Sequence, residues 1–193
     1  MKEQNIVIFA SGAGTNAAKC MEYFSTNTVI NIVALITNNP NSGAIDHAEK
    51  HKINSFVFDN SFFNNGDFLV SKLKELNANY IILAGFLRKI PQKLIQLFED
   101  RIINIHPSLL PKYGGKGMYG NNVHQAVLAN KDLESGITIH IVNEVFDNGR
   151  RVAQFFTPLD TNETLLSLKA KIQYLEHHYF APTIELYIKT RES

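Results

Sequence analysis

Short apolar runs alternate with segments of helical length and spacing along the first half of the chain. The runs are nearly continuous, which is typical of strands covered on both faces; they are Ile6–Ala10, Val29–Ile36, Phe56–Phe58, Tyr80–Ala84 and Ile102–Ile105. Between them, apolar residues recur with helical spacing in Asn16–Phe24, Ala44–His51, Phe68–Leu76 and Pro91–Phe98. Strands that alternate with helices in this way predict an α/β fold with a parallel sheet.

The second half of the chain has a different pattern. Ile137–Ile141 alternates strictly between apolar and polar side chains, which predicts a strand with one less apolar face. Val152–Thr157 is another short strand, and two successive strands favour an antiparallel addition at one end of the sheet. A long helix closes the chain; Asp160–Glu163 is a cap-like start, and Pro182 is expected to kink or end the helix.

Length and composition are those of an ordinary globular protein. The chain has 193 residues, of which 45% are hydrophobic and 19% charged, so we expect one domain spanning residues 1–193. The formal net charge of +1 indicates neither a nucleic-acid partner nor an acidic tail. No apolar run reaches the ~20 residues that span a membrane, and the run near the start is too short for a signal peptide, so we expect a cytoplasmic protein.

The cysteine and histidine positions do not indicate a metal site. The single cysteine, Cys20, excludes an intramolecular disulfide and a paired-cysteine metal site, and it fits a small buried helix residue. The histidines do not form the helical pattern of two ligands with an acid between them, and His47 with His51 fits a solvated helix face. We therefore predict that the protein holds no metal.

The first predicted strand leads into a glycine-containing loop, Ser11–Asn16, and then into a helix. Glycines let the backbone approach a ligand, and a helix N-terminus presents free N–H groups, so the loop is a candidate phosphate site. It lacks the third glycine of a dinucleotide fingerprint and the lysine of a Walker loop. A tight turn in which Thr15 or Asn16 caps the helix explains the same residues, and the two interpretations stay open here.

Asn104 and His106 lie at the end of the fifth predicted strand, and Pro107 follows them. Side chains two apart on an extended chain face the same way, and the proline favours an extended conformation at the histidine. An imidazole exchanges protons near neutral pH, and a neighbouring amide can donate to a developing oxyanion. A capped strand end with an exposed histidine is the structural alternative, but the paired asparagine and the rigid exit favour a site.

Asp147 is a candidate carboxylate partner for this pair, within an Asp-Asn-Gly segment that is also ordinary turn chemistry. A carboxylate near His106 would raise the pKa of the imidazole and orient the ring, but sequence alone does not bring the two together. Thr138 and His140 share the less apolar face of their strand. They are either supporting partners of the site or a satisfied, half-buried pair.

Several segments together resemble one family, the folate-dependent phosphoribosylglycinamide formyltransferases. The matching segments are, in chain order, Ser11–Asn16 (SGAGTN), Ala84–Ile90 (AGFLRKI), Asn104–Tyr113 (NIHPSLLPKY), Ser135–His140 (SGITIH) and Asp147 with Gly149. The resemblance covers essentially the whole chain. It implies a Rossmann-like three-layer formyltransferase fold, with a mostly parallel sheet, an antiparallel strand addition near the C-terminus and a long C-terminal helix.

The resemblance implies an enzyme of purine biosynthesis. Such an enzyme transfers a formyl group from its co-substrate, 10-formyltetrahydrofolate, to the amine of glycinamide ribonucleotide. Asn104 and His106 would stabilise the oxyanion of a tetrahedral intermediate, with His106 as proton donor, and Asp147 would hold the imidazole and a proton-carrying water. The expected partners are these small molecules, without metal, nucleic acid or membrane, and the chain would be a monomer or homodimer.

The resemblance also implies two sets of binding residues. Those for glycinamide ribonucleotide are Gly12, Ala13, Gly14, Thr15, Asn16, Gln173 and Glu176. Those for the folate are Leu87, Arg88, Lys89, Ile90, Asn104, Asn143, Glu144, Val145, Phe146 and Asp147. Gln173 and Glu176 are three apart in the last helix, so we expect them to share a face.

Three features depart from the family pattern. An arginine common in the family is missing near Gly66, and Lys112 is a candidate substitute at the phosphate. The usual Asp-Gly-Gly-Pro is replaced by Asp147–Arg150 (DNGR), for which we expect a less rigid loop. Gly114–Asn122 is a few residues longer than the short family form, and we expect it to make a flexible flap near the substrate entrance.

Other functions use related residues. A methionyl-tRNA formyltransferase would need a second domain and a basic surface, which 193 residues with a net charge of +1 do not favour. A formyltetrahydrofolate hydrolase usually carries an N-terminal regulatory domain, and a sugar N-formyltransferase usually lacks the phosphate loop. A nucleotide-binding module without catalysis would not need Asn104, His106 and Asp147 together.

Overall fold

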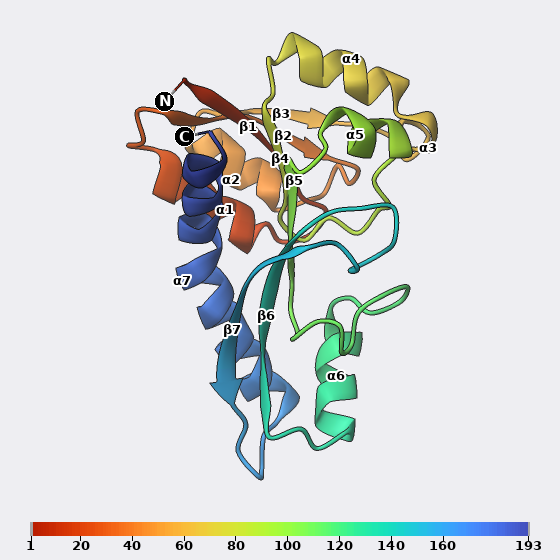
Figure 1. Cartoon of the computed structure of the whole chain (residues 1–193), viewed down its shortest axis with the longest axis vertical. Helices are drawn as coiled ribbons and strands as arrows, with labels where there is room; N and C mark the ends of the chain where they lie inside the picture. Colours follow the sequence, from red (N-terminus) through yellow and green to blue (C-terminus); the bar gives the residue numbers. More distant parts are fainter. Residues whose placement is uncertain (1, 193) are drawn as a thin grey trace.

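Seven strands form one mixed sheet in the computed structural model, which describes residues 2–192 (Figure 1). Their order across the sheet is β3-β2-β1-β4-β5-β6-β7. The strands are β1 (Gln4–Phe9), β2 (Ile30–Thr37), β3 (Asn54–Val57), β4 (Tyr80–Leu83), β5 (Ile102–His106), β6 (Glu134–Ile141) and β7 (Arg151–Pro158). The first five pair in parallel, and β6 and β7 join antiparallel, which confirms the predicted α/β fold.

Helices cover both faces of this sheet (Figure 1). One face carries α1 (Thr15–Phe24), α2 (Ala44–Lys50) and the long α7 (Leu165–Arg191). The other carries α3 (Phe62–Asn65), α4 (Asp67–Glu75) and α5 (Gln92–Leu97), and α6 (Asn121–Ala129) precedes β6. None of the helices within residues 2–192 is both long and apolar enough to cross a membrane.

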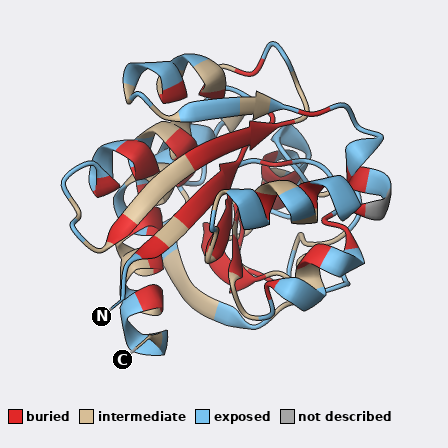
Figure 2. Ribbon diagram, turned by 90° about the horizontal axis from the view of Figure 1, so that it is seen from above, coloured by how far each residue is buried: buried red, intermediate tan, exposed pale blue. Residues whose placement is uncertain are grey.

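Alternation of side chains along the central strands divides the core into two layers. In β1, Ile6 and Ile8 pack in a cluster with residues of α1 and α7, whereas Val7 and Phe9 pack with residues of α4 and α5. All four are at most 1% exposed. Figure 2 shows the central strands buried and the outer helix surfaces exposed. Burial on both faces explains why these strands have continuous apolar sequences.

Most predicted elements lie within about three residues of the observed ones, but two short helices have no predicted counterpart. α3 is a single turn, and α6 follows a glycine-containing segment and buries little apolar surface, so neither shows a clear helical period. Cys20 is buried in α1, as expected, and burial raises the pKa of its thiol to about 12.

The start and the course of α7 differ from the prediction. The helix does not start from Asp160–Glu163; its N-cap is Thr164, whose hydroxyl accepts from the Ser167 N–H at 3.1 Å. Of the two effects expected of Pro182, a kink or an end, the end is wrong, because the helix continues to Arg191. Buried apolar residues on both sides of the proline, such as Ile184, pack against the sheet, and this packing outweighs the lost backbone hydrogen bond.

The cap of α7 is open to a direct test. Thr164→Ala should lower the free energy of unfolding by ~1 kcal/mol, because it removes the acceptor for the first helical turn. Asn162→Ala, in the segment from which the sequence predicts the helix to start, should change it by less than ~0.5 kcal/mol. Chemical denaturation of both variants measures the difference, and equal effects would contradict the observed cap.

Candidate active site

The pairing of β5 with β6 gathers four polar side chains on one face of the sheet. Ile103 and Ile105 of β5 face the α1–α7 layer, so Asn104 and His106 face the opposite way. In the antiparallel register Asn104 lies beside His140, and His106 lies beside Thr138. His106 is the last residue of β5, which confirms the extended conformation expected before Pro107.

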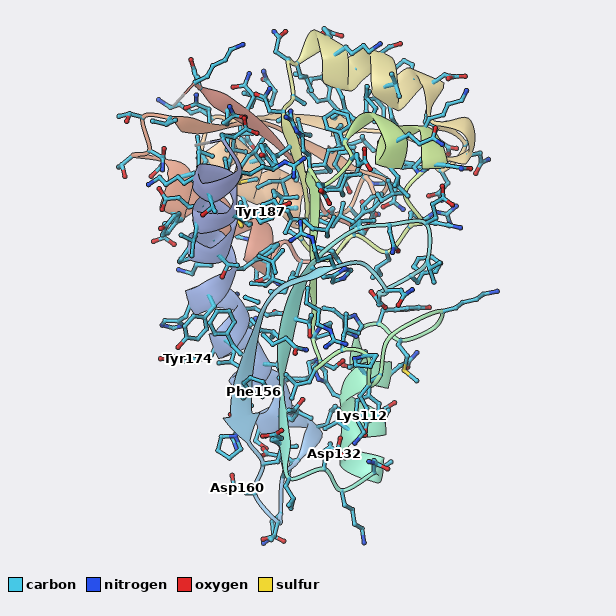
Figure 3. The ribbon with its side chains drawn as sticks, viewed as in Figure 1. Lys112, Asp132, Phe156, Asp160, Tyr174 and Tyr187 are labelled. Carbon is cyan, nitrogen blue, oxygen red and sulfur yellow. The ribbon has the colours of Figure 1, made fainter. Side chains whose placement is uncertain are left out.

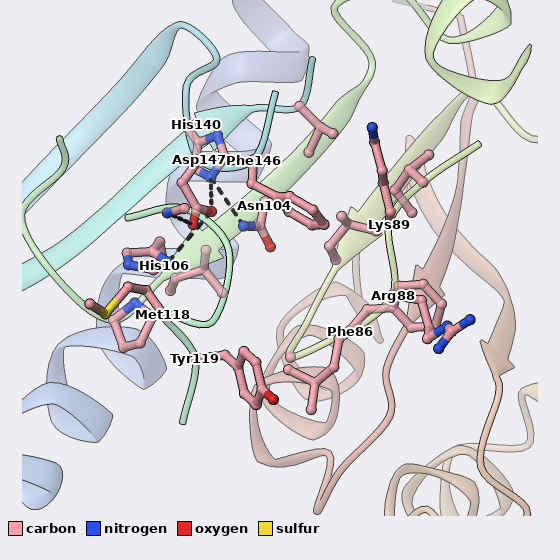
Figure 4. Close-up of a pocket in the computed structure, with 18 of the residues that line it drawn as sticks. Phe86, Arg88, Lys89, Asn104, His106, Met118, Tyr119, His140, Phe146 and Asp147 are labelled. Carbon is pink, nitrogen blue, oxygen red and sulfur yellow. Dashed lines mark hydrogen bonds and ion pairs between the residues drawn. The ribbon is translucent and has the colours of Figure 1, made fainter. Parts of the chain in front are cut away.

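Asp147 comes to this group from the loop after β6. It has a left-handed backbone conformation, with φ of 55°. One carboxylate oxygen, Oδ1, lies 3.5 Å from His106 Nδ1 and 3.7 Å from His140 Nε2. The other, Oδ2, accepts a hydrogen bond from the Gly115 N–H at 2.9 Å. Figure 4 shows the carboxylate, both imidazoles and the Asn104 amide converging on one side of a cavity.

Backbone carbonyls determine which nitrogen of each imidazole carries a proton. His106 Nε2–H donates to the Tyr113 carbonyl at 2.8 Å, and His140 Nδ1–H donates to the Ile141 carbonyl at 2.9 Å. In a neutral His140, Nε2 is therefore an acceptor, and it accepts from the Asn104 amide Nδ2–H at 3.0 Å. Nδ1 of His106 is left facing Asp147 as the atom that can gain and lose a proton.

Burial and charge act in opposite directions on the ionisable groups here. Burial lowers the pKa of His106, and the charge of Asp147 and the hydrogen bond to Tyr113 only partly offset it. Burial alone would raise the pKa of Asp147, but the imidazoles of His140 and His106 and the Gly115 N–H together hold it below its usual value. At neutral pH the site therefore pairs an ionised carboxylate with a neutral His106.

The converging groups form one wall of a cavity of about 490 Å³, the size of a typical small-molecule site. The segments expected to bind folate, Leu87–Ile90 and Asn143–Asp147, both line it. Residues of the predicted flap line it as well, and Figure 4 shows Met118 and Tyr119 facing Phe86 and Phe146 across the space. The cavity surface is therefore mostly apolar, and the polar side chains at its β5–β6 end face charged residues of the opposite wall, such as Arg88 and Lys89.

The Ser11–Asn16 loop has the geometry of a ligand cradle. Gly14 has φ of 76°, and an added Cβ would lie 2.5 Å from the Ala44 Cα, so only glycine fits. The Ser11 and Gly12 carbonyls are held by side chains, one by Asn39 Nδ2 at 3.0 Å and the other by Ser42 Oγ at 2.8 Å. Anchored carbonyls leave the loop N–H groups for a ligand.

The alternative, in which Thr15 or Asn16 caps α1, is wrong, because the N-cap is Gly14 and no side-chain cap is present there. Asn16 Nδ2 instead donates to Glu176 Oε2 at 3.0 Å, and both residues line the cavity. The other loop residues, Gly12 to Thr15, lie outside the lining, and Gln173 is exposed rather than sharing the cavity wall with Glu176.

Two polar atoms of the cavity wall are buried without a hydrogen-bond partner among residues 2–192: Asn16 Oδ1 and His124 Nδ1. Burial lowers the pKa of His124 to about 4, so this ring is neutral. His124 was not a predicted site residue, because α6 was not predicted either. No group of three or more His, Cys, Asp and Glu side chains within residues 2–192 is arranged to hold a metal ion.

Several residues at which this sequence differs from the family pattern can now be placed in the fold. Gly66 has φ of 80°, and a Cβ there would lie 2.8 Å from the Pro91 Cβ, so the position cannot accept the family's arginine without strain. Lys112 lies outside the cavity lining and pairs with Asp132 Oδ1 at 2.6 Å, which does not favour it as the substitute cation. Arg150 also lies outside the lining and donates to the Tyr187 hydroxyl at 3.1 Å.

The sequence and the fold match known proteins over nearly the full length. The family model "Formyl transferase" matches residues 4–184. The chloroplastic phosphoribosylglycinamide formyltransferase of Arabidopsis thaliana is 37% identical over 201 residues, covering 99% of this chain and 69% of the plant protein. The chain spans 63% of the corresponding protein of Vigna unguiculata, at 34% identity. The crystal structure of phosphoribosylglycinamide formyltransferase from Bacillus halodurans is 33% identical, with a TM-score of 0.83 over 95% of each chain.

Glu176 is expected to make stability depend on pH. Burial raises the pKa of its carboxyl group to about 7. A carboxyl group whose pKa is raised by folding stabilises the protein below its unfolded pKa, and that contribution is lost as pH rises through the folded pKa. The free energy of unfolding should therefore fall by ~3 kcal/mol from this group between about pH 4.5 and pH 7.5.

Glu176→Gln should remove this part of the pH dependence, since an amide does not titrate. Denaturation of both proteins across the range, without ligand, measures the difference between the two curves. Curves that stay parallel would contradict a raised pKa at Glu176.

Proposed function

The chain belongs to the formyl transferase family, and we propose that it acts as a phosphoribosylglycinamide formyltransferase through Asn104, His106 and Asp147. The reaction moves the formyl group of 10-formyltetrahydrofolate to the amine of glycinamide ribonucleotide, giving formylglycinamide ribonucleotide and tetrahydrofolate in purine biosynthesis. One observation carries the proposal. A single cavity is lined by the proton-handling residues, by both expected folate segments, and by Asn16 at the end of the glycine loop.

The amine nitrogen attacks the formyl carbon, and the carbonyl oxygen becomes an oxyanion. Asn104 Nδ2 uses one hydrogen for His140, so its second hydrogen is available to donate to that oxyanion. His106 Nδ1 is the second group at this position, because its other nitrogen is occupied by the Tyr113 carbonyl. In the neutral ring Nδ1 carries no hydrogen, so it can donate here only after it has taken up a proton. Both groups come from one strand, which holds them in fixed relative positions.

The proton balance closes without a covalent enzyme intermediate. The amine loses one proton as its bond to carbon forms, and the folate nitrogen gains one as its bond to carbon breaks. Asp147 is ionised and lies 3.5 Å from His106 Nδ1, so it stabilises the imidazolium that forms when Nδ1 holds the proton in transit. His106 then donates toward the leaving nitrogen.

The cavity and the glycine loop at its edge suit the two substrates. Leu87–Ile90 and Asn143–Asp147 line the cavity with both apolar and polar side chains, which suits a pterin ring that has flat faces and polar edges. The glycine loop leads into the uncapped N-terminus of α1, a ten-residue helix without an acidic residue in its first turn, which suits a phosphate. Asn16 and Glu176, between the two, are placed for the ribose and glycinamide. Gln173 stays a predicted contact at this end.

The proposal also covers the cellular location, the oligomeric state and the partners of the enzyme. We propose a cytoplasmic enzyme; the similar proteins include a bacterial one, the phosphoribosylglycinamide formyltransferase of Bacillus subtilis, which is 32% identical to this chain. It acts on small molecules, as a monomer or homodimer, without nucleic acid or membrane.

The activity itself is tested with purified protein. Glycinamide ribonucleotide and 10-formyltetrahydrofolate together should give the absorbance change of tetrahydrofolate formation, and neither alone should. Release of tetrahydrofolate at the same rate without the ribonucleotide would replace this assignment with a hydrolase that uses water as acceptor.

His106→Ala should lower kcat by ~10²–10⁴-fold, because the variant lacks the group that holds the proton. His178→Ala is a matched control: this histidine is exposed on α7 and bonds its own helix backbone. Steady-state kinetics of the two variants measure the contrast. A kcat for His106→Ala close to that of the control would remove His106 from the mechanism.

A further inference from the structure

The Tyr113 carbonyl controls what kind of acid His106 can be. Because Nε2–H is held by this carbonyl at 2.8 Å, a proton arriving at Nδ1 produces an imidazolium. An imidazolium is a far stronger acid than a neutral imidazole. Without the carbonyl, Asp147 would favour the neutral ring with its hydrogen on Nδ1, and the ring would lose this acidity.

The backbone conformation of Tyr113 is not one that a tyrosine favours by itself, so other contacts must stabilise it. It has a left-handed conformation, with φ of 56°, which is unfavourable for a residue with a bulky side chain. Its phenol donates to Asp132 Oδ2 at 2.7 Å, and this bond fixes the side chain. Asp132 lies just after α6, nineteen residues further along the chain.

Asp132 is itself well fixed. Its Oδ1 binds Lys112 Nζ at 2.6 Å and accepts from Asn130 Nδ2 at 2.5 Å, and its side chain is 14% exposed. Burial alone would raise the pKa of Asp132, but the hydrogen bonds from Lys112, Tyr113 and Asn130 outweigh it and keep the carboxyl ionised. Figure 3 shows Lys112 and Asp132 together beside α6.

We propose that Asp132, which does not line the cavity, is a positioning residue for the reaction: it anchors Tyr113 so that the Tyr113 carbonyl keeps the proton of His106 on Nε2. The chain of contacts runs from the Asp132 carboxylate through the Tyr113 phenol and backbone to the imidazole. The kinetic part of this inference rests on the proposed function, because it assumes that His106 exchanges the proton in formyl transfer. The part that concerns which nitrogen of His106 carries the proton does not rest on the proposed function.

Nitrogen-15 NMR of the full-length, ligand-free protein reads the imidazole directly. In the wild type above its pKa, neutral His106 should carry its proton on Nε2. Asp132→Ala should shift neutral His106 toward the Nδ1–H form. Asp160→Asn is the control, because it removes a carboxylate from another lysine pair, Lys171 Nζ to Asp160 Oδ2 at 2.8 Å, and should leave the His106 spectrum unchanged.

Kinetics separate positioning from a general loss of structure. Asp132→Ala should lower kcat by ~10- to 100-fold, the usual effect of a small misplacement, with KM for both substrates within about twofold. Tyr113→Phe removes only the phenol bond and should change kcat and the His106 spectrum in the same direction. It serves as the test if Asp132→Ala does not fold.

An unchanged His106 spectrum in the folded variant, or a wild-type kcat despite a changed spectrum, would overturn the proposal. A wild-type protein that does not use glycinamide ribonucleotide would overturn the proposed function instead, while the NMR comparison would still decide the role of Asp132.

Discussion

The antiparallel register between β5 and β6 is the constraint on which the site depends. It sets Asn104 beside His140 and His106 beside Thr138, and β6 then delivers Asp147 from its exit loop. A shift of one residue would turn Asn104 and His106 toward the α1–α7 layer and bury them among apolar side chains. The isoleucines between them prevent such a shift, because they fill the core on that side. The alternation of apolar and polar side chains along β5 therefore stabilises the sheet and also positions Asn104 and His106.

Most hydrogen-bonding atoms of the buried side chains on β5 and β6 already have a partner within the protein, so few remain to contact the substrates. His106 Nε2 and His140 Nδ1 are bound to backbone carbonyls, and Asn104 shares one amide hydrogen with His140. Of these three side chains, what remains for substrate is one amide hydrogen and one imidazole nitrogen, both on β5. A cavity that lowers the local dielectric strengthens the interactions of these two groups.

The sequence predicts the sheet and half of the site because local patterns determine them. Continuous apolar runs identify the central strands, and a spacing of two places Asn104 and His106 on one face. The approach of Asp147 depends on strand pairing and on a left-handed turn, which no local pattern contains. Lys112 has the charge expected of a phosphate ligand, but its partner, Asp132, is twenty residues away in sequence, so the pair is visible only in the fold.

The start of α7 and the residue at position 66 are both determined by tertiary packing. Asp160–Glu163 has a reasonable cap composition, yet the packing of Leu168 and Ile172 against the sheet determines where the helix starts, and Thr164 provides its cap. At position 66 the close approach of Pro91 and the positive φ favour glycine. In both cases tertiary packing decides between local options that the sequence leaves open.

The central claim is that the cavity and the glycine loop at its edge together hold both substrates, with β5 at their junction. A crystal structure with glycinamide ribonucleotide and a folate analogue that cannot transfer its formyl group tests it most directly. The phosphate should lie on the Ser11–Asn16 loop and the pterin against Leu87–Ile90, with the amine beside Asn104 and His106. A phosphate bound elsewhere, or an amine out of reach of His106 Nδ1, would contradict the account.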